Sequence, residues 1–183
     1  CIEADKLGVD EGLMLDKNGY VTTCNSTNFF IVCDNEVWTS TGEYCLNGVT
    51  RANIIKICKA HDVKVFEKNF ILDDVYKAEE VFVTGTFAGV IPVKSVDGIN
   101  IGDGKRGSLT RKLQEWYAYN IEKMVKSMNH RGPDFSSVLK HNNLIMGHNR
   151  LSIIDTSNRA NQPFNNEKGI LSYNGEIYNY KEL

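Results

Sequence analysis

Short apolar runs separated by turn residues dominate the first two thirds of the chain and predict a sheet of short strands. Runs of this length, rich in β-branched and aromatic side chains, are typical of buried or half-buried strands. Strands are expected over residues 13–15, 20–23, 29–33, 36–39, 63–66, 80–84 and 91–96. Asn18-Gly19 and Asp34-Asn35 are strong turn signals between them. Successive hairpins therefore indicate that much of this segment forms one sheet.

Helices are expected at four places along the same segment. Apolar residues three and four positions apart predict helices over 49–60 and 108–124, and Thr50 is placed to cap the first of them. Shorter helices are expected over 2–7 and 72–78. The fold class that follows is α/β in the broad sense (α+β), with a mixed sheet.

The last third of the chain has a different composition. Its expected strands are short, over 144–146, 151–154 and 170–173. Residues 1–120 carry 13 Lys+Arg against 17 Asp+Glu, whereas residues 121–183 carry 8 against 6. Asparagine is also denser in the second range, with ten in 63 residues against nine in the first 120. This shift predicts a domain boundary near residue 120, within the long helix.

The overall composition excludes several classes of function. A formal net charge of −2 gives no basic footprint for nucleic acid, and no apolar run is long enough for a membrane helix. The first residues lack the pattern of a signal peptide. Five cysteines without a Cys-x-x-Cys pair favour neither a disulfide framework nor a zinc site, and a reducing cytoplasm fits them best.

Two glycine–threonine turns are the first candidates for chemistry. Asn47-Gly48-Val49-Thr50 precedes the 49–60 helix, and Thr84-Gly85-Thr86 follows a strand. Free N–H groups at a helix N-terminus, together with a hydroxyl group, bind anions such as phosphate. The same residues are also ordinary for turns and caps, so the local pattern alone leaves both interpretations open.

Three motifs in order give a family resemblance for residues 1–120. TTCNSTNFFIV (22–32), VWTSTGEYCLNGVTRANII (37–55) and VFVTGTFAGVIPV (81–93) resemble the class IV pyridoxal-phosphate aminotransferases, which include the branched-chain and D-amino-acid aminotransferases. The resemblance implies the partial large domain of such an enzyme, transfer of an amino group from an amino acid to a 2-oxo acid, and a homodimer in the full-length protein. A lyase on the same fold is the alternative.

The resemblance also implies roles for individual residues. Val49 and Thr50 would contact the phosphate of pyridoxal phosphate, and Thr86 would add a second hydroxyl. The turn from Thr86 through Phe87 and Ala88 would face the substrate carboxylate. Thr23 stands where the family has the glutamate that pairs with the ring nitrogen, and a neutral hydroxyl cannot supply that charge. The Schiff-base lysine would lie before residue 1, so we expect no transamination by the chain as given.

A second group of motifs occupies the last third: HRGPD (130–134), GHNRLSIID (147–155), NQPF (161–164) and YNGEIYNYKEL (173–183). A lone arginine or a hairpin turn is usually structural. In a functional interpretation, however, Arg150 could bind a carboxylate with two hydrogen bonds. Asn174 and the Gly175 amide could form an oxyanion hole, and Glu176 could bind an ammonium group.

Together these motifs closely resemble the N-terminal glutaminase domain of glutamine-hydrolysing asparagine synthetases, which are class II glutamine amidotransferases. The resemblance implies a partial N-terminal-nucleophile sheet, glutamine as ligand and no cofactor. Arg150 would hold the glutamine α-carboxylate, and Ile153 and Ile154 would line the site. Asn174 and Gly175 would form the oxyanion hole, and Glu176 would contact the amino group. The N-terminal nucleophilic cysteine of the family has no counterpart before His130.

The sequence therefore predicts two segments with separate chemistry. Residues 1–120 would be the C-terminal segment of a class IV aminotransferase, and residues 121–183 part of a class II glutamine amidotransferase domain. Because both nucleophiles are absent, we expect a fragment that joins two enzymes and is inactive as given. A non-catalytic module that keeps the phosphate or glutamine pocket is the alternative.

Overall fold

The computed structural model describes residues 2–86, 89–141 and 144–175. The chain divides into two units, Cys1–Ala118 and Tyr119–Leu183, and the division falls inside one continuous helix. No helix in the described ranges is long and apolar enough to cross a membrane.

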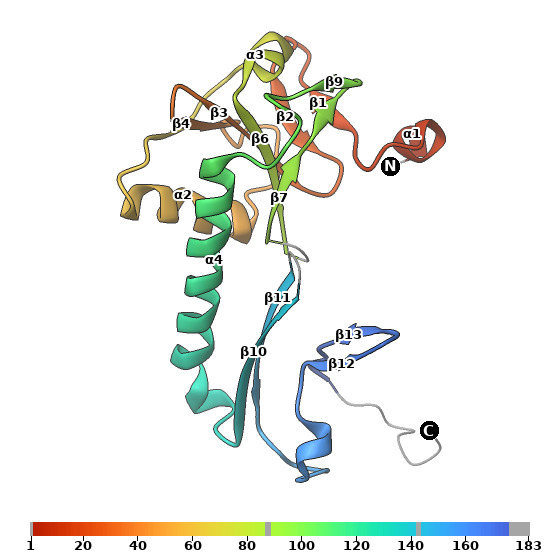
Figure 1. Ribbon diagram of the computed structural model, residues 1–183, viewed down its shortest axis with the longest axis vertical. Coiled ribbons are helices and arrows are strands. Elements are labelled where there is room, and N and C mark those ends of the chain that lie inside the picture. Colours follow the sequence, from red (N-terminus) through yellow and green to blue (C-terminus); the bar gives the residue numbers. More distant parts are fainter. Residues whose placement is uncertain (1, 87–88, 142–143, 176–183) are drawn as a thin grey trace. The chain divides into compact units, whose positions relative to one another are not determined.

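A five-stranded mixed sheet is the centre of the first unit (Figure 1). The strand order is β5-β4-β3-β6-β7, and only β4 and β5 run parallel. Its strands are β3 (Asn28–Cys33), β4 (Glu36–Thr39), β5 (Val65–Glu67), β6 (Glu80–Gly85) and β7 (Gly89–Val93). Two small antiparallel pairs accompany it, β1 (Leu13–Leu15) with β2 (Val21–Cys24) and β8 (Ser95–Val96) with β9 (Ile99–Asn100). The helices are α1 (Ile2–Leu7), α2 (Val49–Ala60), α3 (Leu72–Lys77) and α4 (Ser108–Ser127).

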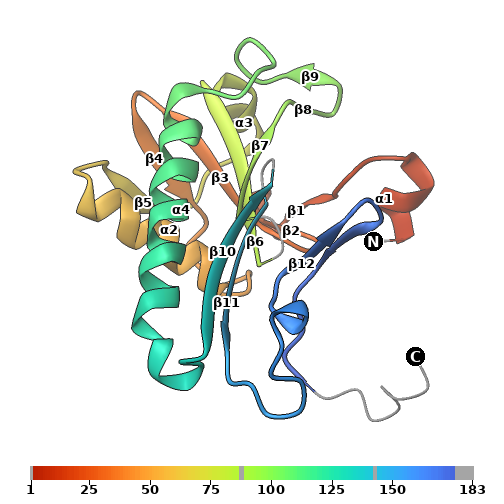
Figure 2. The same ribbon diagram turned by 60° about the horizontal axis from the view of Figure 1, so that its bottom comes forward.

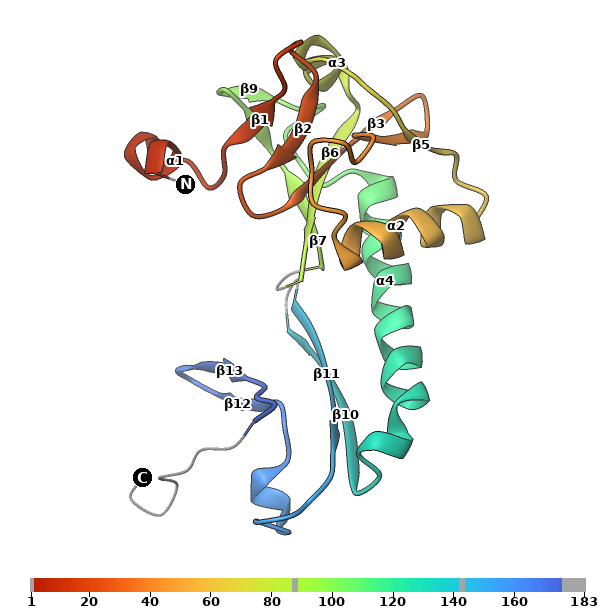
Figure 3. The same ribbon diagram turned by 180° about the vertical axis from the view of Figure 1, so that it is seen from behind.

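Both faces of this sheet are buried, which explains the continuous apolar runs of β3 and β6. The helix α2 and the beginning of α4 lie on one face (Figure 2), where Ile54 and Leu113 pack with the stacked rings of Phe30 and Phe82. The strand β2 and the helix α3 lie on the other face (Figure 3), over a second cluster that includes Phe29. Neighbouring residues of β3 therefore point into two different clusters, as the period of a strand requires.

The hairpin between β3 and β4 forms because two residues accept left-handed backbone angles. Asp34 has φ 51° and Asn35 has φ 60°, the conformation that a two-residue type I′ turn needs at both central positions. Aspartate and asparagine tolerate that region better than other residues that have a Cβ atom. The predicted turn, and the mixed α/β fold class, are confirmed.

The second unit consists of two hairpins and the C-terminal half of α4. The hairpins are β10 (Phe135–His141) with β11 (Leu144–Arg150) and β12 (Phe164–Asn166) with β13 (Gly169–Leu171). Short 3-10 helices cover Asn129–Arg131 and Asn158–Ala160. The Asn149 amide donates to the Val125 carbonyl of α4 at 2.8 Å, and Lys140 pairs with Glu122 at 2.6 Å. The fully buried apolar side chains of the described residues all belong to the first unit.

Three predictions of local structure are wrong. Residues 151–154 form no strand; they follow the end of β11, and Ile153 is 78% exposed. The expected strand over 91–96 is two strands, β7 and β8, which belong to different sheets. Thr50 does not cap α2, because Gly48 is the N-cap residue and makes no side-chain cap hydrogen bond.

Candidate functional site

The tight turn that joins β2 to β3 forms one side of the candidate site. The Thr23 hydroxyl donates to the Thr27 carbonyl at 2.7 Å, and the Cys24 amide donates to the same oxygen at 2.9 Å. The Thr27 hydroxyl in turn donates to a carboxylate oxygen of Glu11 at 2.5 Å. These bonds fix Thr23, a residue predicted to contact the cofactor, beside the first residues of β3.

Asn28, the first residue of β3, holds the loop that leads into α2. Its side-chain amide donates to the Leu46 carbonyl at 2.8 Å, and the Gly48 amide donates to the same oxygen at 2.8 Å. A Cβ atom on residue 48 would lie only 2.5 Å from the Asn28 side-chain oxygen. Gly48 is therefore required by the close approach of Asn28, and its φ of −62° would suit any residue.

The first turn of α2 has the character of an anion-binding helix N-terminus. The first intrahelical bond of α2 runs from the Ala52 amide to the Gly48 carbonyl at 3.0 Å, so the Val49 and Thr50 amides precede it. The first turn contains no acidic residue, and the aligned peptide dipoles give this end a partial positive charge. Val49 is exposed, whereas Thr50 is buried.

The end of β6 approaches the same place. Thr84 lies directly opposite Asn28 in the antiparallel pairing of β3 and β6, so both side chains are on the sheet face that carries α2. The Thr84 hydroxyl oxygen is buried and has no hydrogen-bond partner among the described residues. At Gly85, an added Cβ would lie 3.3 Å from the Thr27 methyl group, and the next residue, Thr86, is exposed.

The structure thus brings together the predicted residues Thr23, Val49, Thr50 and Thr86 around the Thr27–Asn28 corner. We call the segments Gly48–Thr50 and Thr84–Thr86 the cradle. Phe87 and Ala88, predicted to face the substrate carboxylate, lie outside the described residues.

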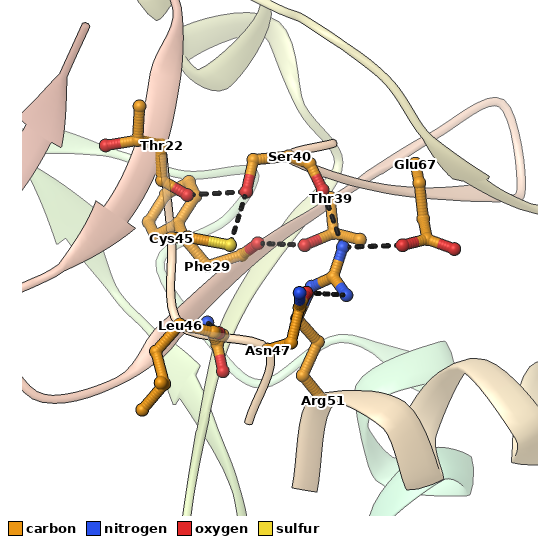
Figure 4. A network of polar contacts seen from close by, with 10 residues as sticks. Thr22, Phe29, Thr39, Ser40, Cys45, Leu46, Asn47, Arg51 and Glu67 are labelled. Atoms are coloured by element: carbon orange, nitrogen blue, oxygen red, sulfur yellow. Dashed lines mark hydrogen bonds and ion pairs between the residues drawn. The ribbon is translucent and has the colours of Figure 1, made fainter. Parts of the chain in front are cut away.

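Sequence reasoning missed a buried polar network behind the cradle, which Figure 4 shows. Arg51 in the first turn of α2 is only 3% exposed. One terminal nitrogen of its guanidinium donates to the Ser40 carbonyl at 2.6 Å and to Glu67 at 2.8 Å, and the other donates to Asn47 at 3.3 Å. The Ser40 hydroxyl donates to the Thr22 carbonyl at 2.6 Å. The network ties the loop before α2 to β2 and β5.

Three of the described cysteines of the first unit are poorly suited to act as nucleophiles. Cys24, Cys33, Cys45 and Cys58 are free. Burial raises the pKa of the Cys24 and Cys58 thiols to about 12 and that of Cys33 to about 11, so these three stay protonated and unreactive near neutral pH. In the described ranges, no group of three or more His, Cys, Asp or Glu residues could hold a metal ion.

A polar pocket of about 250 Å³ lies within the second unit. Arg150, predicted to bind a carboxylate, lines it and donates to the carbonyls of Ser157 and Asp155 and to the Asn161 side chain. These contacts engage three of the five N–H donors of the guanidinium. Hydrogen bonds from Ser157, together with Arg159, hold the pKa of Asp155 well below its usual range. The pocket is lined by Asp134, Arg150, Ser152, Thr156, Asn158 and Asn161.

Four other residues predicted for this second site are not among the residues that line the pocket. Ile153 and Ile154 are exposed and are not among the residues that line the pocket. Asn174 and Gly175 are also exposed. Glu176 lies outside the described residues.

Comparison with known proteins identifies the first unit. The model of the family "Amino-transferase class IV" matches residues 2–96, which is more than half of the chain. The chain belongs to the class IV aminotransferases. The model "Glutamine amidotransferase domain" matches residues 106–183 and so begins just before α4. This match agrees with the resemblance to an amidotransferase domain. It does not extend to the finer assignment to asparagine synthetase.

Individual relatives agree with the class IV match. A branched-chain-amino-acid aminotransferase of Pseudomonas aeruginosa is 45% identical over 115 residues, covering 63% of this chain and 38% of the relative. A D-alanine aminotransferase of Listeria monocytogenes is 37% identical over 109 residues, covering 59% and 38%. The chain therefore spans well under half of the length of these curated relatives.

Solved structures show the same fold. The crystal structure of Escherichia coli branched-chain amino acid aminotransferase has a TM-score of 0.60 at 39% identity, covering 62% of this chain and 38% of that one. The T.th. branched-chain amino acid aminotransferase with pyridoxamine 5'-phosphate has a TM-score of 0.65 at 34% identity, covering 70% and 42%.

Proposed function

We propose that the first unit is the cofactor-phosphate-binding part of a pyridoxal-phosphate-dependent amino-acid aminotransferase, acting on amino acids and 2-oxo acids. The observation that carries this proposal is the convergence of the α2 N-terminus and the end of β6 on the Thr27–Asn28 corner. Two structures of one relative, the T.th. branched-chain amino acid aminotransferase, were solved with phosphorylated pyridoxyl compounds, which supports the same cofactor class here.

The residues of the cradle fit a phosphate group. Amide donors at Val49 and Thr50 precede the first bond of α2, and a phosphate at a helix N-terminus is stabilised by both the donors and the dipole. Gly48 and Gly85 allow Asn28 and Thr27 to pack closely against the backbone of the cradle, and the buried Thr84 hydroxyl has an unused hydrogen-bonding capacity. When bound, pyridoxal phosphate supplies the electron sink for amino transfer.

Each residue then has a limited task. The amides of Val49 and Thr50 hold the phosphate and so fix the orientation of the ring, and the exposed Thr86 hydroxyl adds a donor. Thr23 already gives its proton to the Thr27 carbonyl, so it can only accept a hydrogen bond from a ring nitrogen. Because Thr23 is neutral, we infer that this position stabilises a protonated ring less than a carboxylate would.

Binding of the phosphate group can be measured directly. We expect the full chain to bind pyridoxal phosphate, and to bind pyridoxal, which lacks the phosphate, at least about tenfold more weakly, because charge-assisted bonds to the phosphate supply much of the affinity. Isothermal titration with the two compounds gives the ratio. We also expect borohydride treatment to leave no stoichiometric adduct on a single lysine.

One result would contradict this function, and another would contradict the expectation that the chain has no Schiff-base lysine. Equal affinities for pyridoxal and pyridoxal phosphate would show that the cradle does not recognise phosphate. A one-to-one adduct fixed at one lysine of this chain would show that the Schiff-base lysine is present in the segment. Peptide mass spectrometry after borohydride treatment identifies the modified residue.

We propose a second function for the second unit, the binding of glutamine as part of a class II glutamine amidotransferase domain of the asparagine synthetase type. The specific observation is that Arg150 lines a polar pocket with spare guanidinium donors, in a segment that matches the amidotransferase model. The α-carboxylate of glutamine would bind Arg150 there. The predicted contributions of Asn174, Gly175 and Glu176 remain part of this proposal.

Recognition of the carboxylate is the expected signature of the second function. We expect L-glutamine to shift the backbone amide resonances of Ser152 and Asn161, and 4-aminobutanamide, which lacks the α-carboxylate, to shift neither. Arg150→Gln is expected to weaken glutamine binding about tenfold, the effect of losing a charge-assisted bond. Nuclear magnetic resonance titration measures both effects. Equal shifts from the two compounds would contradict a carboxylate site at Arg150.

We further propose a functional boundary near residue 120, with residues 1–120 in the first role and 121–183 in the second. A homodimer of the full-length aminotransferase and a reducing, cytoplasmic location remain proposals as well. The free cysteines of the first unit support the location, because thiols persist in reducing compartments.

A further inference from the structure

We propose that the positive charge of Arg51, which lies next to the cradle, raises the affinity of the cradle for an anion, and that Glu67 partly cancels this charge. The inference deepens the proposed function of the first unit and rests on it. The proposal follows from the placement of one buried cation next to an anion-binding helix end.

The position of Arg51 is the first part of the argument. Arg51 is in the first turn of α2, directly after the predicted phosphate contacts Val49 and Thr50. Its guanidinium returns to Asn47, the residue before Gly48, at 3.3 Å (Figure 4). The positive charge therefore lies close to the cradle. Because its side chain is only 4% exposed, solvent screens this charge less than a surface charge.

The charge balance is the second part. Glu67 pairs with Arg51 at 2.8 Å, but its side chain is 44% exposed, so solvent screens the carboxylate more strongly than the guanidinium. Protein carbonyl and amide oxygens at Ser40 and Asn47 supply the other contacts, and they are neutral. The pair consequently leaves a residual positive potential on the buried side, which favours an anion.

Unused hydrogen-bonding capacity is the third part. Two buried polar groups near the cradle have no partner among the described residues: the Arg51 Nε and the Thr84 hydroxyl. Thr84 faces the same side as Asn28, whose amide holds the loop at Leu46. Buried polar groups without partners are rare in folded proteins, and at this place they indicate a site prepared for a polar ligand.

The two possible roles of Glu67, bracing the loop or cancelling charge, predict different effects for Glu67→Gln. If Glu67 only braces the loop, Glu67→Gln weakens anion binding or leaves it unchanged. If Glu67 cancels part of the Arg51 charge, Glu67→Gln tightens binding of inorganic phosphate about threefold, as expected for a charge that solvent partly screens. The urea midpoint should fall in the same variant, because a buried guanidinium has lost its counter-charge.

The experiment compares phosphate affinity in the full chain at low ionic strength by isothermal titration, with pyridoxal phosphate as a second probe. Arg51→Gln should weaken phosphate binding about fivefold. Arg51→Lys keeps the charge but loses the planar guanidinium donors, and its phosphate affinity should stay within about twofold of the wild-type value. Glu36→Gln is the control variant. It breaks the ion pair between Glu36 and Lys64 and should leave phosphate affinity unchanged. The gain in Glu67→Gln should shrink as salt is added.

The possible outcomes distinguish a failure of this inference from a failure of the proposed function of the first unit. Unchanged or weaker phosphate binding by Glu67→Gln overturns the inference, as does a loss in Arg51→Lys equal to that in Arg51→Gln. A wild-type chain that binds neither phosphate nor pyridoxal phosphate overturns the proposed function together with the inference. If Arg51→Gln does not fold, Glu67→Gln still tests the inference. Because the Glu67 side chain is half-exposed, we expect this variant to fold.

Discussion

Replacing Phe30 by alanine is expected to lower the free energy of unfolding of the first unit by about 3–5 kcal/mol. Phe30 is fully buried and stacks on Phe82 of the neighbouring strand, with ring centroids 4.8 Å apart. The two rings join the sheet to α2 and α4, so truncating Phe30 leaves a cavity at the centre of this cluster. A loss of this size is a large part of the stability of an ordinary domain.

Urea unfolding followed by tryptophan fluorescence measures this loss. Both tryptophans, Trp38 and Trp116, belong to the first unit, so the signal reports that unit alone. Phe66→Ala is the matched control, because Phe66 is 41% exposed on β5 and its truncation should cost less than about 1 kcal/mol. Equal losses for the two variants would mean that the stacked pair is not the centre of the core.

Local patterns were sufficient for much of the first unit. The helix expected over 49–60 is confirmed as α2, because its apolar spacing agrees with the face that it buries through Ile54 and Cys58. The turn at Asp34-Asn35 is confirmed because its chemistry is contained in two residues. Such features need only neighbours in sequence, and a single sequence contains them.

Contacts between distant residues could not be read in this way. The Glu80 carboxylate accepts hydrogen bonds from the amides of Leu109 and Thr110 and so caps α4 from 29 and 30 residues away. The Asn28–Leu46 bond spans 18 residues in the same manner. In the sequence, Glu80 is only the start of a strand. The residues that shape the candidate site therefore appeared only in the structure.

In the second unit, the prediction of strands from the hydrophobic pattern failed. The strand β10, with the sequence FSSVLKH, was not expected, because its few apolar residues do not give a clear strand period. The apolar run LSII at 151–154 was expected to be a strand, yet Leu151, Ile153 and Ile154 are exposed. Hydrophobic pattern predicts structure where side chains are buried, and the described part of this unit has no fully buried apolar side chain.

Gly48→Ala is expected to weaken binding of pyridoxal phosphate by about tenfold or more, the effect of losing one good hydrogen bond together with the placement of the amides. The new Cβ would lie 2.5 Å from the Asn28 side-chain oxygen. Asn28 cannot move away without breaking its bond to the Leu46 carbonyl, which places the first turn of α2. Gly12→Ala is the control, because its Cβ would meet only ordinary contacts at 3.7 and 3.8 Å.

A double-mutant cycle distinguishes this steric cause from a general loss of structure. Asn28→Ala removes the oxygen that the new Cβ would meet, so Gly48→Ala should weaken pyridoxal phosphate binding much less in that background than in the wild type. Titrations of the four proteins give the coupling between the two positions. Strictly additive losses would mean that Asn28 does not hold the loop against Gly48, and the cradle would then owe its geometry to the Arg51 network alone.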